Sequence, residues 1–572
     1  MARFALGGPR SSSDRAVFAL LRAAGILLGL GFVLIALSYQ GYLSYTDLDP
    51  PEVEVTPQAF SIDPTGRRLD YGRNWLGRDG RIWRLHLEGT PEQMGDARGR
   101  LTSRLFRQLD DDVLETIERR YSAGLEAWTA AMVLRWDYRG ADRFVDEEHR
   151  RELAAMALAL PEAGGERLDA YHRLFLYQCL YGLTQRLDDV LLEGHMFAAV
   201  PKRRSGAEPG NLVIGRTLTI DLGREADPDR IVTFYRPDGR YPFVSVGWAG
   251  MIGVVTGINA RGIFVGLDAA RTDDPLEDGA PLPLVLRQVL ERADTLEQAV
   301  EILTQAELRT SGIVLVGDGV QRKAVVLELA ARDREDRRTA RGEDDNVVWA
   351  TDHMITDAFE GDMQNDWVRR YTSSGYRYDR LAELLADTDV IDAQAAVEIL
   401  RDRRGKESTA LGLGNRNALE NMATSQSIVL DATAMVMWVA EGPSTLGRYR
   451  AIDLRRELGR DDSPPAPLED LPSDPLLYSE QYRDYEEALE ALEHASKLLA
   501  DGYAERALWS AKVALALAPD VGDLHRLLGD IERELGHNDQ AREHYHRYLE
   551  LVPGRRREQV RVEGILAELE QQ

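Results

Sequence analysis

The chain has 572 residues, 44% of them hydrophobic, and its 96 acidic and 70 basic residues give a formal net charge of −26 at pH 7. This length exceeds the usual size of one hydrophobic core, so we expect two or more folded units. The acidic balance argues against a general nucleic-acid surface, because phosphate binding requires a positive field. Since Cys179 is the only cysteine, an internal disulfide and zinc sites of paired cysteines are excluded.

The N-terminal segment from Ala16 to Leu37 is apolar except for Arg22. It is long enough to cross a hydrocarbon core of about 30 Å. Arginines lie before or at its start and acidic residues follow it, which puts the N-terminus in the cytoplasm and the bulk of the chain outside it. We therefore predict a cytoplasmic tail and a single-pass membrane anchor over residues 1–45. A cleaved signal peptide is the alternative, because Ala36-Leu37-Ser38 forms a passable cleavage site.

The middle of the chain changes from helical to β-rich patterns. Residues 46–82 contain Asp49-Pro50-Pro51 and few apolar runs, which is typical of a spacer. From Thr90 to Arg186 apolar residues recur at spacings of three and four, which predicts amphipathic helices. From Leu212 onward short β-rich runs bounded by glycine alternate with helical segments. We expect an α+β domain over residues 83–455, in which helices cover sheets.

The last part of the chain is predicted to be helical throughout. A stretch rich in Pro and Asp marks a linker over residues 456–478. Within 479–572, like residues recur 34 positions apart: Gly502 and Gly536, Ala507 and Ala541, Leu515 and Leu549, Pro519 and Pro553. This is the tetratricopeptide period, in which each unit is a pair of helices, with two unrelated helical hairpins as the alternative. Such repeats usually present a groove to a peptide or protein partner.

Several segments resemble a known enzyme family. Leu85 to Gly95, with Gly99 following, resembles the opening of the acyl-coenzyme A:6-aminopenicillanate acyltransferase family, which groups with choloylglycine hydrolases. The run from Gly247 to Gly262 is similar to the family's signature strand pair, in which an Asn-x-x-Gly turn joins two glycine-punctuated strands. The resemblance covers residues 83–455 and implies a four-layer αββα sandwich of the N-terminal-nucleophile hydrolase type.

The resemblance implies a self-cleaving enzyme, but the nucleophile does not match. Members of the family cut themselves before a cysteine, whose thiol and new α-amino group perform acyl transfer or amide hydrolysis. A nucleophile of this kind needs a thiol or a hydroxyl. The family's Gly-Cys-Thr-Ser-Phe-Ala-like segment corresponds to Glu193 to Ala199 here. Alignment on Phe197 puts the nucleophile at Gly194, and alignment on the preceding glycine puts it at His195; neither residue can supply this chemistry.

Other positions of the implied active site have also changed. Arg216 keeps an arginine that helps to position the nucleophile, whereas Thr219 stands where an aspartate is expected, with Asp221 as a substitute. Two oxyanion-hole asparagines of the choloylglycine branch are replaced by Asp268 and Asp352. A carboxylate cannot donate a hydrogen bond to an oxyanion unless it is protonated. The candidate site residues are His195, Arg216, Asp268, Asp352 and Arg377, where Arg377 keeps the family's second arginine.

Several of these residues also have a purely structural interpretation. Arg216 and Arg377 are also explained as structural ion pairs with Asp268 or Asp352. Cys179 falls in a predicted helix and is interpreted as an ordinary buried cysteine. Ser205 lies in a polar turn and is interpreted as a solvated loop hydroxyl.

Three hypotheses of function follow. The first is a membrane-tethered pseudoenzyme that keeps the fold, stays uncut and binds a ligand or partner. The second is an active amide hydrolase or acyltransferase in which Asp268, Asp352 and His353 form an acid/base group and an arginine orients the substrate. The third makes the repeats the functional centre, with an aromatic groove near Trp509, Tyr545 and Tyr548. No metal-ligand spacing or phosphate loop occurs, so no cofactor is expected.

Overall fold

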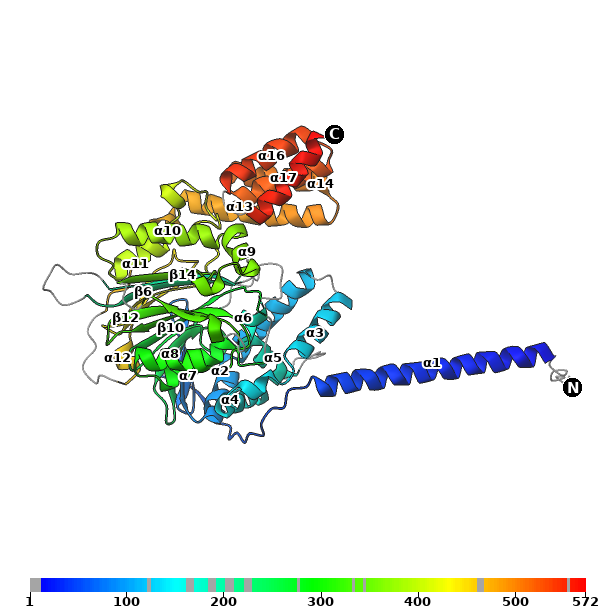
Figure 1. The fold of residues 1–572 in the computed structure, drawn as a ribbon, viewed down its shortest axis with the longest axis horizontal. Coiled ribbons are helices and arrows are strands. Elements are labelled where there is room, and N and C mark those ends of the chain that lie inside the picture. Colours follow the sequence, from blue (N-terminus) through cyan, green and yellow to red (C-terminus); the bar gives the residue numbers. More distant parts are fainter. Residues whose placement is uncertain are drawn as a thin grey trace.

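A computed structural model of the chain describes residues 12–120, 125–160, 169–183, 192–200, 210–220, 229–274, 278–331, 335–342, 346–459, 468–552 and 556–571. Two packed sheets with helices around them form the body, from which one long helix projects, and a helical region ends the chain (Figure 1). Ser205, Asp221, Pro553 and the middle of the predicted linker lie outside the described residues.

The larger sheet has eleven strands in the order β1-β2-β3-β4-β7-β8-β9-β10-β11-β12-β13. Neighbouring strands are antiparallel except β4 and β7, which pair in parallel from Trp83 and Ile231 to Gly89 and Pro237. The strands are β1 (Phe60–Ile62), β2 (Arg68–Tyr71), β3 (Asn74–Asp79), β4 (Ile82–Gly89), β7 (Ile231–Pro237), β8 (Phe243–Gly247), β9 (Thr256–Asn259), β10 (Ile263–Ala269), β11 (Gly312–Asp318), β12 (Lys323–Leu329) and β13 (Arg338–Arg341).

The smaller sheet has six antiparallel strands in the order β14-β5-β6-β15-β16-β17. They are β14 (Val347–Thr351), β5 (Leu192–Ala199), β6 (Val213–Ile220), β15 (Gln426–Asp431), β16 (Val436–Ala440) and β17 (Tyr449–Asp453). Because successive side chains of a strand point to opposite faces, each sheet buries one set of residues against the other sheet. The buried cluster between the sheets includes Met196, Ile214 and Ile428 from the smaller sheet and Phe234, Phe264 and Ile313 from the larger one.

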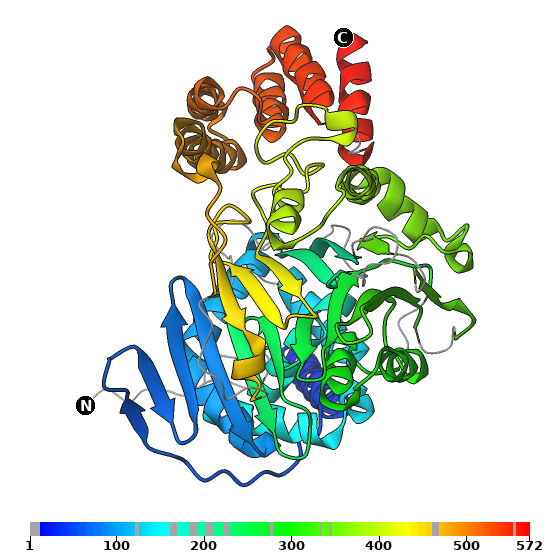
Figure 2. The ribbon, with the colours of Figure 1, turned by 90° about the vertical axis from the view of Figure 1, so that its left-hand side faces the viewer.

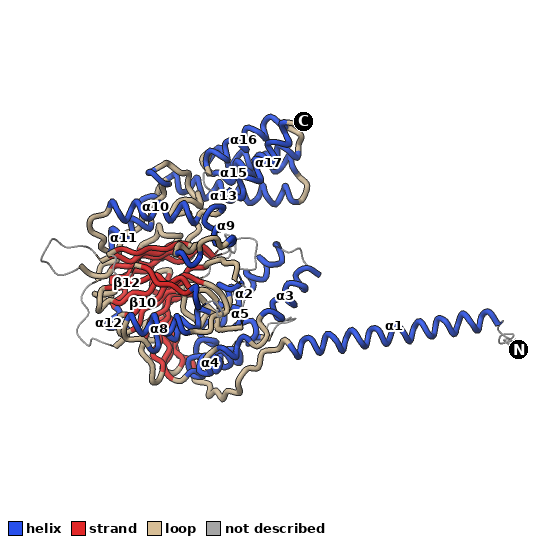
Figure 3. Tube along the Cα trace, in the orientation of Figure 1, coloured by secondary structure: helices blue, strands red, loops and turns tan. Residues whose placement is uncertain are grey.

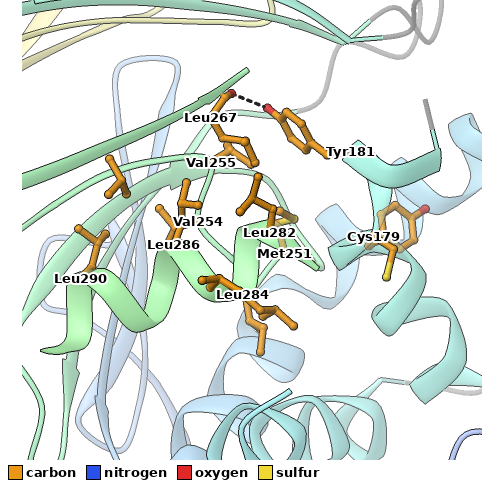
Figure 4. Close-up of a cluster of buried hydrophobic side chains, with 14 of the residues drawn as sticks. Cys179, Tyr181, Met251, Val254, Val255, Leu267, Leu282, Leu284, Leu286 and Leu290 are labelled. Carbon is orange, nitrogen blue, oxygen red and sulfur yellow. Dashed lines mark hydrogen bonds between the residues drawn. The ribbon is translucent and has the colours of Figure 1, made fainter. Parts of the chain in front are cut away.

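Helices cover the outer faces of both sheets. The larger sheet packs against α2 (Pro91–Arg120), α4 (Glu147–Ala159), α5 (Ala170–Gln178), α7 (Leu282–Arg292) and α8 (Leu296–Gln305). Figure 4 shows part of this cluster, in which Leu286 of α7 lies beside Val254. The smaller sheet packs against α10 (Ser374–Asp387) and α11 (Ala393–Leu400). The remaining helices of the body are α3 (Leu125–Asp137), α6 (Leu180–Leu183), α9 (Met363–Tyr371) and α12 (Leu454–Glu457). The predicted mixture of helices and sheets is confirmed, and Figure 3 shows the strands gathered between the helices.

A buried ionic network, which we call the Arg287 network, ties α4 to α7. The guanidinium of Arg287 contacts Glu152 at 2.6 Å and Glu291 at 2.8 Å. Glu291 also lies 2.9 Å from the ring of His149. All four side chains are at most 3% exposed. The network therefore neutralises its charges away from water.

The spacer predicted over residues 46–82 is wrong, because most of this stretch is built into the larger sheet. It contains β1, β2 and β3, and β4 begins at Ile82. Tight turns join these strands, and Gly72 and Gly80 adopt positive φ angles of 61° within them. In the sequence, these strands were signalled by residues of alternating character between glycine turns. Residues 47–59 form a connection without regular structure between α1 and β1.

The projecting helix is α1 (Ser12–Tyr45), and its part from Leu27 to Tyr45 is long and apolar enough to cross a membrane by length and composition. Most exposed side chains of this part are apolar, with Ser38, Gln40 and Ser44 as exposed polar residues near its end, and none of the 19-residue stretch is buried inside the protein. Figure 1 shows α1 leaving the body as a single straight helix.

The C-terminal helices stack beside the edge of the body at which α10 lies (Figure 2). They are α13 (Glu480–Ala500), α14 (Ala504–Leu517), α15 (Gly522–Glu534), α16 (Asn538–Leu551) and α17 (Arg556–Glu570). Gly502 and Gly536 both follow a helix with positive φ, at 80° and 77°. Ala507 and Ala541 are both fully buried in the next helix. These residues, spaced by 34 positions, therefore occupy equivalent places in two helix pairs.

The aromatic groove suggested for this region is not formed by the residues named for it. Tyr545 and Tyr548 are fully buried, and the Tyr545 hydroxyl donates to Asp530 at 2.8 Å. Trp509 is 73% exposed on α14. The two tyrosines are core residues, because the 3.6-residue period of α16 turns them toward α15.

Candidate functional site

The strand register separates the two nucleophile positions that the alignments gave. On β5, Gly194 pairs with Leu218 and Met196 pairs with Arg216, whereas His195 pairs with Thr217. Directly paired residues share a face of the sheet. Met196 belongs to the cluster between the sheets, and the next residue, Phe197, packs against the helices outside. Gly194 therefore faces the larger sheet together with Arg216, and His195 faces the helices.

Arg216 reaches from β6 to the larger sheet. Its guanidinium donates to the carbonyl of Val255 at 2.6 Å, and also to the carbonyl of Leu267 and the hydroxyl of Thr256. Its Nη2 lies 3.4 Å from Oδ1 of Asp268 on β10. Arg216 is 1% exposed. It is therefore held by backbone carbonyls more closely than by a carboxylate.

Asp268 occupies the space that a side chain at position 194 would need. A Cβ atom added to Gly194 would lie 2.4 Å from Oδ1 of Asp268 and 3.0 Å from the carbonyl oxygen of Thr217. Carbon atoms do not approach other heavy atoms this closely without displacing them. The position implied for the nucleophile is thus filled by the carboxylate of the opposite sheet.

Asp352 lies on the other side of Gly194, just after β14. Its Oδ1 accepts the backbone N–H of Gly194 at 2.7 Å, and its Oδ2 accepts Nη2 of Arg377 on α10 at 2.8 Å. Arg377 also contacts Glu193 at 3.2 Å. The structure therefore brings together Gly194, Arg216, Asp268, Asp352 and Arg377, which we call the Gly194 cluster.

The carboxyl groups of the Gly194 cluster are poorly stabilised as anions. Burial raises the pKa of Asp268 to about 6, although Arg216 acts in the opposite direction. Burial also raises the pKa of Asp352 well above its usual value, against the effect of Arg377 and with the repulsion of Asp268 added. Oδ2 of Asp268 and Nε of both arginines lack hydrogen-bond partners among the described residues. The cluster is dense and charged, and its charges are incompletely matched.

The two candidate histidines lie outside the Gly194 cluster. His195 is bonded to the hydroxyl of Thr217, at 3.0 Å from Nδ1, and burial lowers its pKa well below 6.5. His353 lies 2.8 Å from the hydroxyl of Ser374 on α10, and burial lowers its pKa to about 3. Both are neutral rings bonded to hydroxyl groups. The predicted acid/base group of Asp268, Asp352 and His353 is therefore brought together only in its two carboxylates.

Three other residues near the cluster have defined places. Thr219, expected at an aspartate position, is buried on β6 and pairs with Glu193. Tyr181 of α6 donates its hydroxyl to the carbonyl of Leu267 at 3.2 Å (Figure 4), and Leu267 directly precedes Asp268 in β10. Cys179 is 2% exposed, and burial raises the pKa of its thiol far above its usual value, so it is no substitute nucleophile. Sequence reasoning missed Tyr181 and Glu193, although Glu193 directly precedes Gly194.

A second group of polar residues lies where α1 meets the body. Ligand atoms of Asp47, Asp169 and His172 lie within 4.8 Å of one another, which is a spacing compatible with a metal ion. Nδ1 of His172 is 2.9 Å from Asp169, and the guanidinium of Arg135 is 3.2 Å from Asp47. A guanidinium at this distance already supplies positive charge to the carboxylates. We interpret the group as a hydrogen-bonded clamp.

A family model matches part of the central domain. Residues 209–442 match the model described as acyl-coenzyme A:6-aminopenicillanic acid acyl-transferase. This match confirms that the chain resembles this acyltransferase family, as the sequence predicted.

Individual relatives are distant. An uncharacterized protein of Archaeoglobus fulgidus is 23% identical over 282 residues, which are 47% of this chain and 46% of that protein. The chain thus spans about half the length of this curated relative. A Caenorhabditis elegans ortholog of N-acylethanolamine-hydrolyzing acid amidase is 18% identical, with 42% of this chain and 93% of that chain covered and a TM-score of 0.30. A mutant conjugated bile acid hydrolase from Clostridium perfringens is 13% identical, with 47% and 95% covered and a TM-score of 0.30.

Proposed function

We propose that this protein is a membrane-anchored relative of these acyltransferases and amidohydrolases that has lost the self-cleaving nucleophile and acts by binding. The domain is proposed to be a four-layer αββα sandwich over residues 83–455, extended at its start by β1 to β3. The observation that carries the proposal is the place of Gly194: it has no side chain, and the Asp268 carboxylate stands where one would point. Neither self-cleavage nor attack on an amide can start from such a position.

The oxyanion donors implied by the family support the same proposal. The positions of both asparagines hold buried carboxylates here, Asp268 and Asp352. Asp352 already accepts the N–H of Gly194 and the guanidinium of Arg377. As anions these groups repel a developing negative charge, where the implied amides would stabilise it. At the position of the family's reaction centre, hydrogen bonds and ion pairs now hold the two sheets and α10 together.

One observation favours the alternative, an active amide hydrolase or acyltransferase that acts on a small acylated substrate. The raised pKa values of Asp268 and Asp352 leave a proton on this pair at acidic pH, and a protonated carboxyl can act as a general acid or donate to an oxyanion. Against it stands His353, which is bonded to Ser374 and not to either carboxylate.

The flanking regions complete the proposal. Residues 1–45 are proposed to hold a cytoplasmic tail and a single membrane-spanning anchor, with the bulk of the chain extracytoplasmic. Residues 479–572 are proposed to be tetratricopeptide repeats that bind a peptide or protein partner. The equivalent places of Gly502 and Gly536 support the repeats, and the apolar exposed length of α1 supports the anchor.

The first test is the intact mass of the purified full chain, with sequencing of any new N-terminus. A chain that is uncut between β4 and β17 supports the proposal. A cut just before residue 194, or before any Ser, Thr or Cys of the domain, overturns it.

The second test separates binding from catalysis. The wild type and the Asp352→Asn variant are incubated with a panel of N-acylated amino acids, and product formation and thermal shift are measured on the same samples. We expect no turnover by either protein. Turnover by the wild type that is lost in Asp352→Asn at acidic pH would instead establish the acid/base alternative.

A further inference from the structure

The end of α1 is held in a fixed place against α3. The hydroxyl of Tyr42 donates to the carbonyl of Met132. Arg135 is 5% exposed and donates to the carbonyl of Leu43, the hydroxyl of Thr46 and the carboxylate of Asp47, each at 3.2 Å. Thr46 is fully buried. The last turn of α1 and the part of α3 beside it therefore lie in the same surroundings.

The face of α3 beside this joint is apolar and about half exposed at Val133 and Trp136. Among the 13 residues of α3, only Glu126, Thr129, Arg135 and Asp137 are polar or charged. Val133 is 48% exposed and Trp136 is 45% exposed. A helix that is apolar nearly all round is normally buried in protein or in lipid.

The aromatic residues at the joint have the chemistry of a membrane–water interface. The Trp136 ring stacks on Tyr42, with centroids 6.3 Å apart, and lies 5.6 Å from Tyr45. The guanidinium of Arg139 lies 4.4 Å above the Trp136 ring. Trp and Tyr are enriched at the headgroup level, and an arginine beside them can keep its charge in the headgroups while its stem stays in apolar surroundings.

The arrangement of the helices agrees with this placement. Figure 1 shows the hairpin of α2 and α3 pointing to the same side of the body as α1. The apolar part of α1, Leu27–Tyr45, continues up to the joint itself. If this part crosses the hydrocarbon core, its last turn lies at the headgroup level, and the joint lies there too.

We propose that the exposed face of α3 formed by Val133 and Trp136, together with Tyr45, lies in the headgroup region of the bilayer and forms a second, shallow membrane contact. This proposal rests on the proposed membrane anchoring by α1. The body is then attached at one orientation, and the occupant of the apolar face is lipid and not a second protein.

The test uses the full chain reconstituted into phosphatidylcholine and phosphatidylglycerol vesicles. The chain has nine tryptophans, so the signal of Trp136 is obtained as the difference between the wild type and Trp136→Phe. We expect this difference signal to be blue-shifted and strongly quenched by lipids brominated close to the headgroup. The matched control is Trp509→Phe, which removes a 73% exposed tryptophan of the C-terminal helices, and its difference signal should not be quenched.

A second variant guards against misfolding of Trp136→Phe. Val133→Cys, labelled with an environment-sensitive dye, should show a blue shift on vesicles, since the native Cys179 is buried and unlabelled. Protein that floats with vesicles but shows neither quenching at Trp136 nor a dye shift at position 133 overturns the contact of α3 alone. Cross-linking of two Val133→Cys chains through this face would assign it to a second copy instead. Protein that does not float with vesicles overturns both the anchor and the contact.

Discussion

The Gly194 cluster, where the two sheets and α10 meet, and the Arg287 network, between α4 and α7, are both buried sets of charges, yet the balance of their charges differs. In the Arg287 network the pKa of Glu291 is held well below its usual value, because His149 and Arg287 outweigh its burial. In the Gly194 cluster burial outweighs the arginines, and the pKa values of both aspartates are raised. The first is a neutralised structural tie. The second is a buried cluster whose charges are incompletely matched.

The largest expected effect comes from the balanced network. Arg287→Met leaves Glu152 and Glu291 buried with less positive charge, and we expect a loss of about 3–5 kcal/mol in the free energy of unfolding. Denaturant titration of the purified chain measures it. The matched control is Arg240→Met, which removes an exposed ion pair with Glu148 and should cost less than about 1 kcal/mol. Equal losses in the two variants would remove the distinction between the regions.

A smaller effect is expected from the steric block at Gly194. Gly194→Ala should lower the free energy of unfolding by about 1–3 kcal/mol, because the added methyl group meets the Asp268 carboxylate. In an Asp268→Ala background this loss should shrink, and a double-mutant cycle measures the coupling. The control is Gly564→Ala on α17, where nothing lies within 4 Å of the added atom. A cycle without coupling would place Asp268 away from residue 194.

The stability contributed by the two regions should also change with pH in opposite directions. The folded pKa of Asp268 is raised from 3.8 to about 6, so the folded state binds more protons between these values. The stability of the wild type relative to Asp268→Asn should therefore fall by up to about 3 kcal/mol as the pH rises through this window. The pKa of Glu291 is lowered, so the stability that Glu291 adds relative to Glu291→Gln is present above 4.5 and is lost as the pH falls. Unfolding titrations across the range check both slopes, and slopes of equal sign would contradict the comparison.

The smallest effect is expected at His195, on the face of the smaller sheet away from the Gly194 cluster. Burial lowers its pKa well below 6.5, and we expect the ring to be neutral between about pH 5 and 8. His195→Gln keeps a polar group near Thr217 and should change the free energy of unfolding by about 1 kcal/mol or less, equally at all these pH values. A change that grows toward pH 5 would show that His195 becomes charged and would make it a candidate site residue again.

The sequence was a good guide where a pattern depends on neighbouring residues. The Asn-x-x-Gly turn at Asn259 is formed as expected: its side chain accepts the N–H groups of Arg261 and Ile263, and its amide donates to carbonyls at the end of α7. Asp268 and Asp352 were singled out because Asp268 lies in a short motif within β10 and Asp352 lies in one just after β14. Four of the five candidate site residues meet around one glycine.

The rest depended on contacts that no local pattern carries. Whether Gly194 or His195 faces the other sheet depends on the strand register, and a shift of one residue reverses it. His353 was grouped with Asp352 because they are adjacent in sequence, but adjacent residues at the end of a strand point to opposite sides. The strands before residue 82 pair with one another and with β4 through short turns, and they were missed because Pro and Asp near residue 50 suggested a spacer; only β4 pairs with a distant partner, β7.

If the proposed membrane anchor is present, the edges of the larger sheet have a further consequence. At one edge β1 is only three residues long, and at the other β13 carries Arg338 and Arg341. Short or charged edge strands resist pairing with the backbone of another chain. Copies gathered in two dimensions meet far more often than copies free in solution, so edges of this kind protect crowded neighbours from aggregating through their sheets.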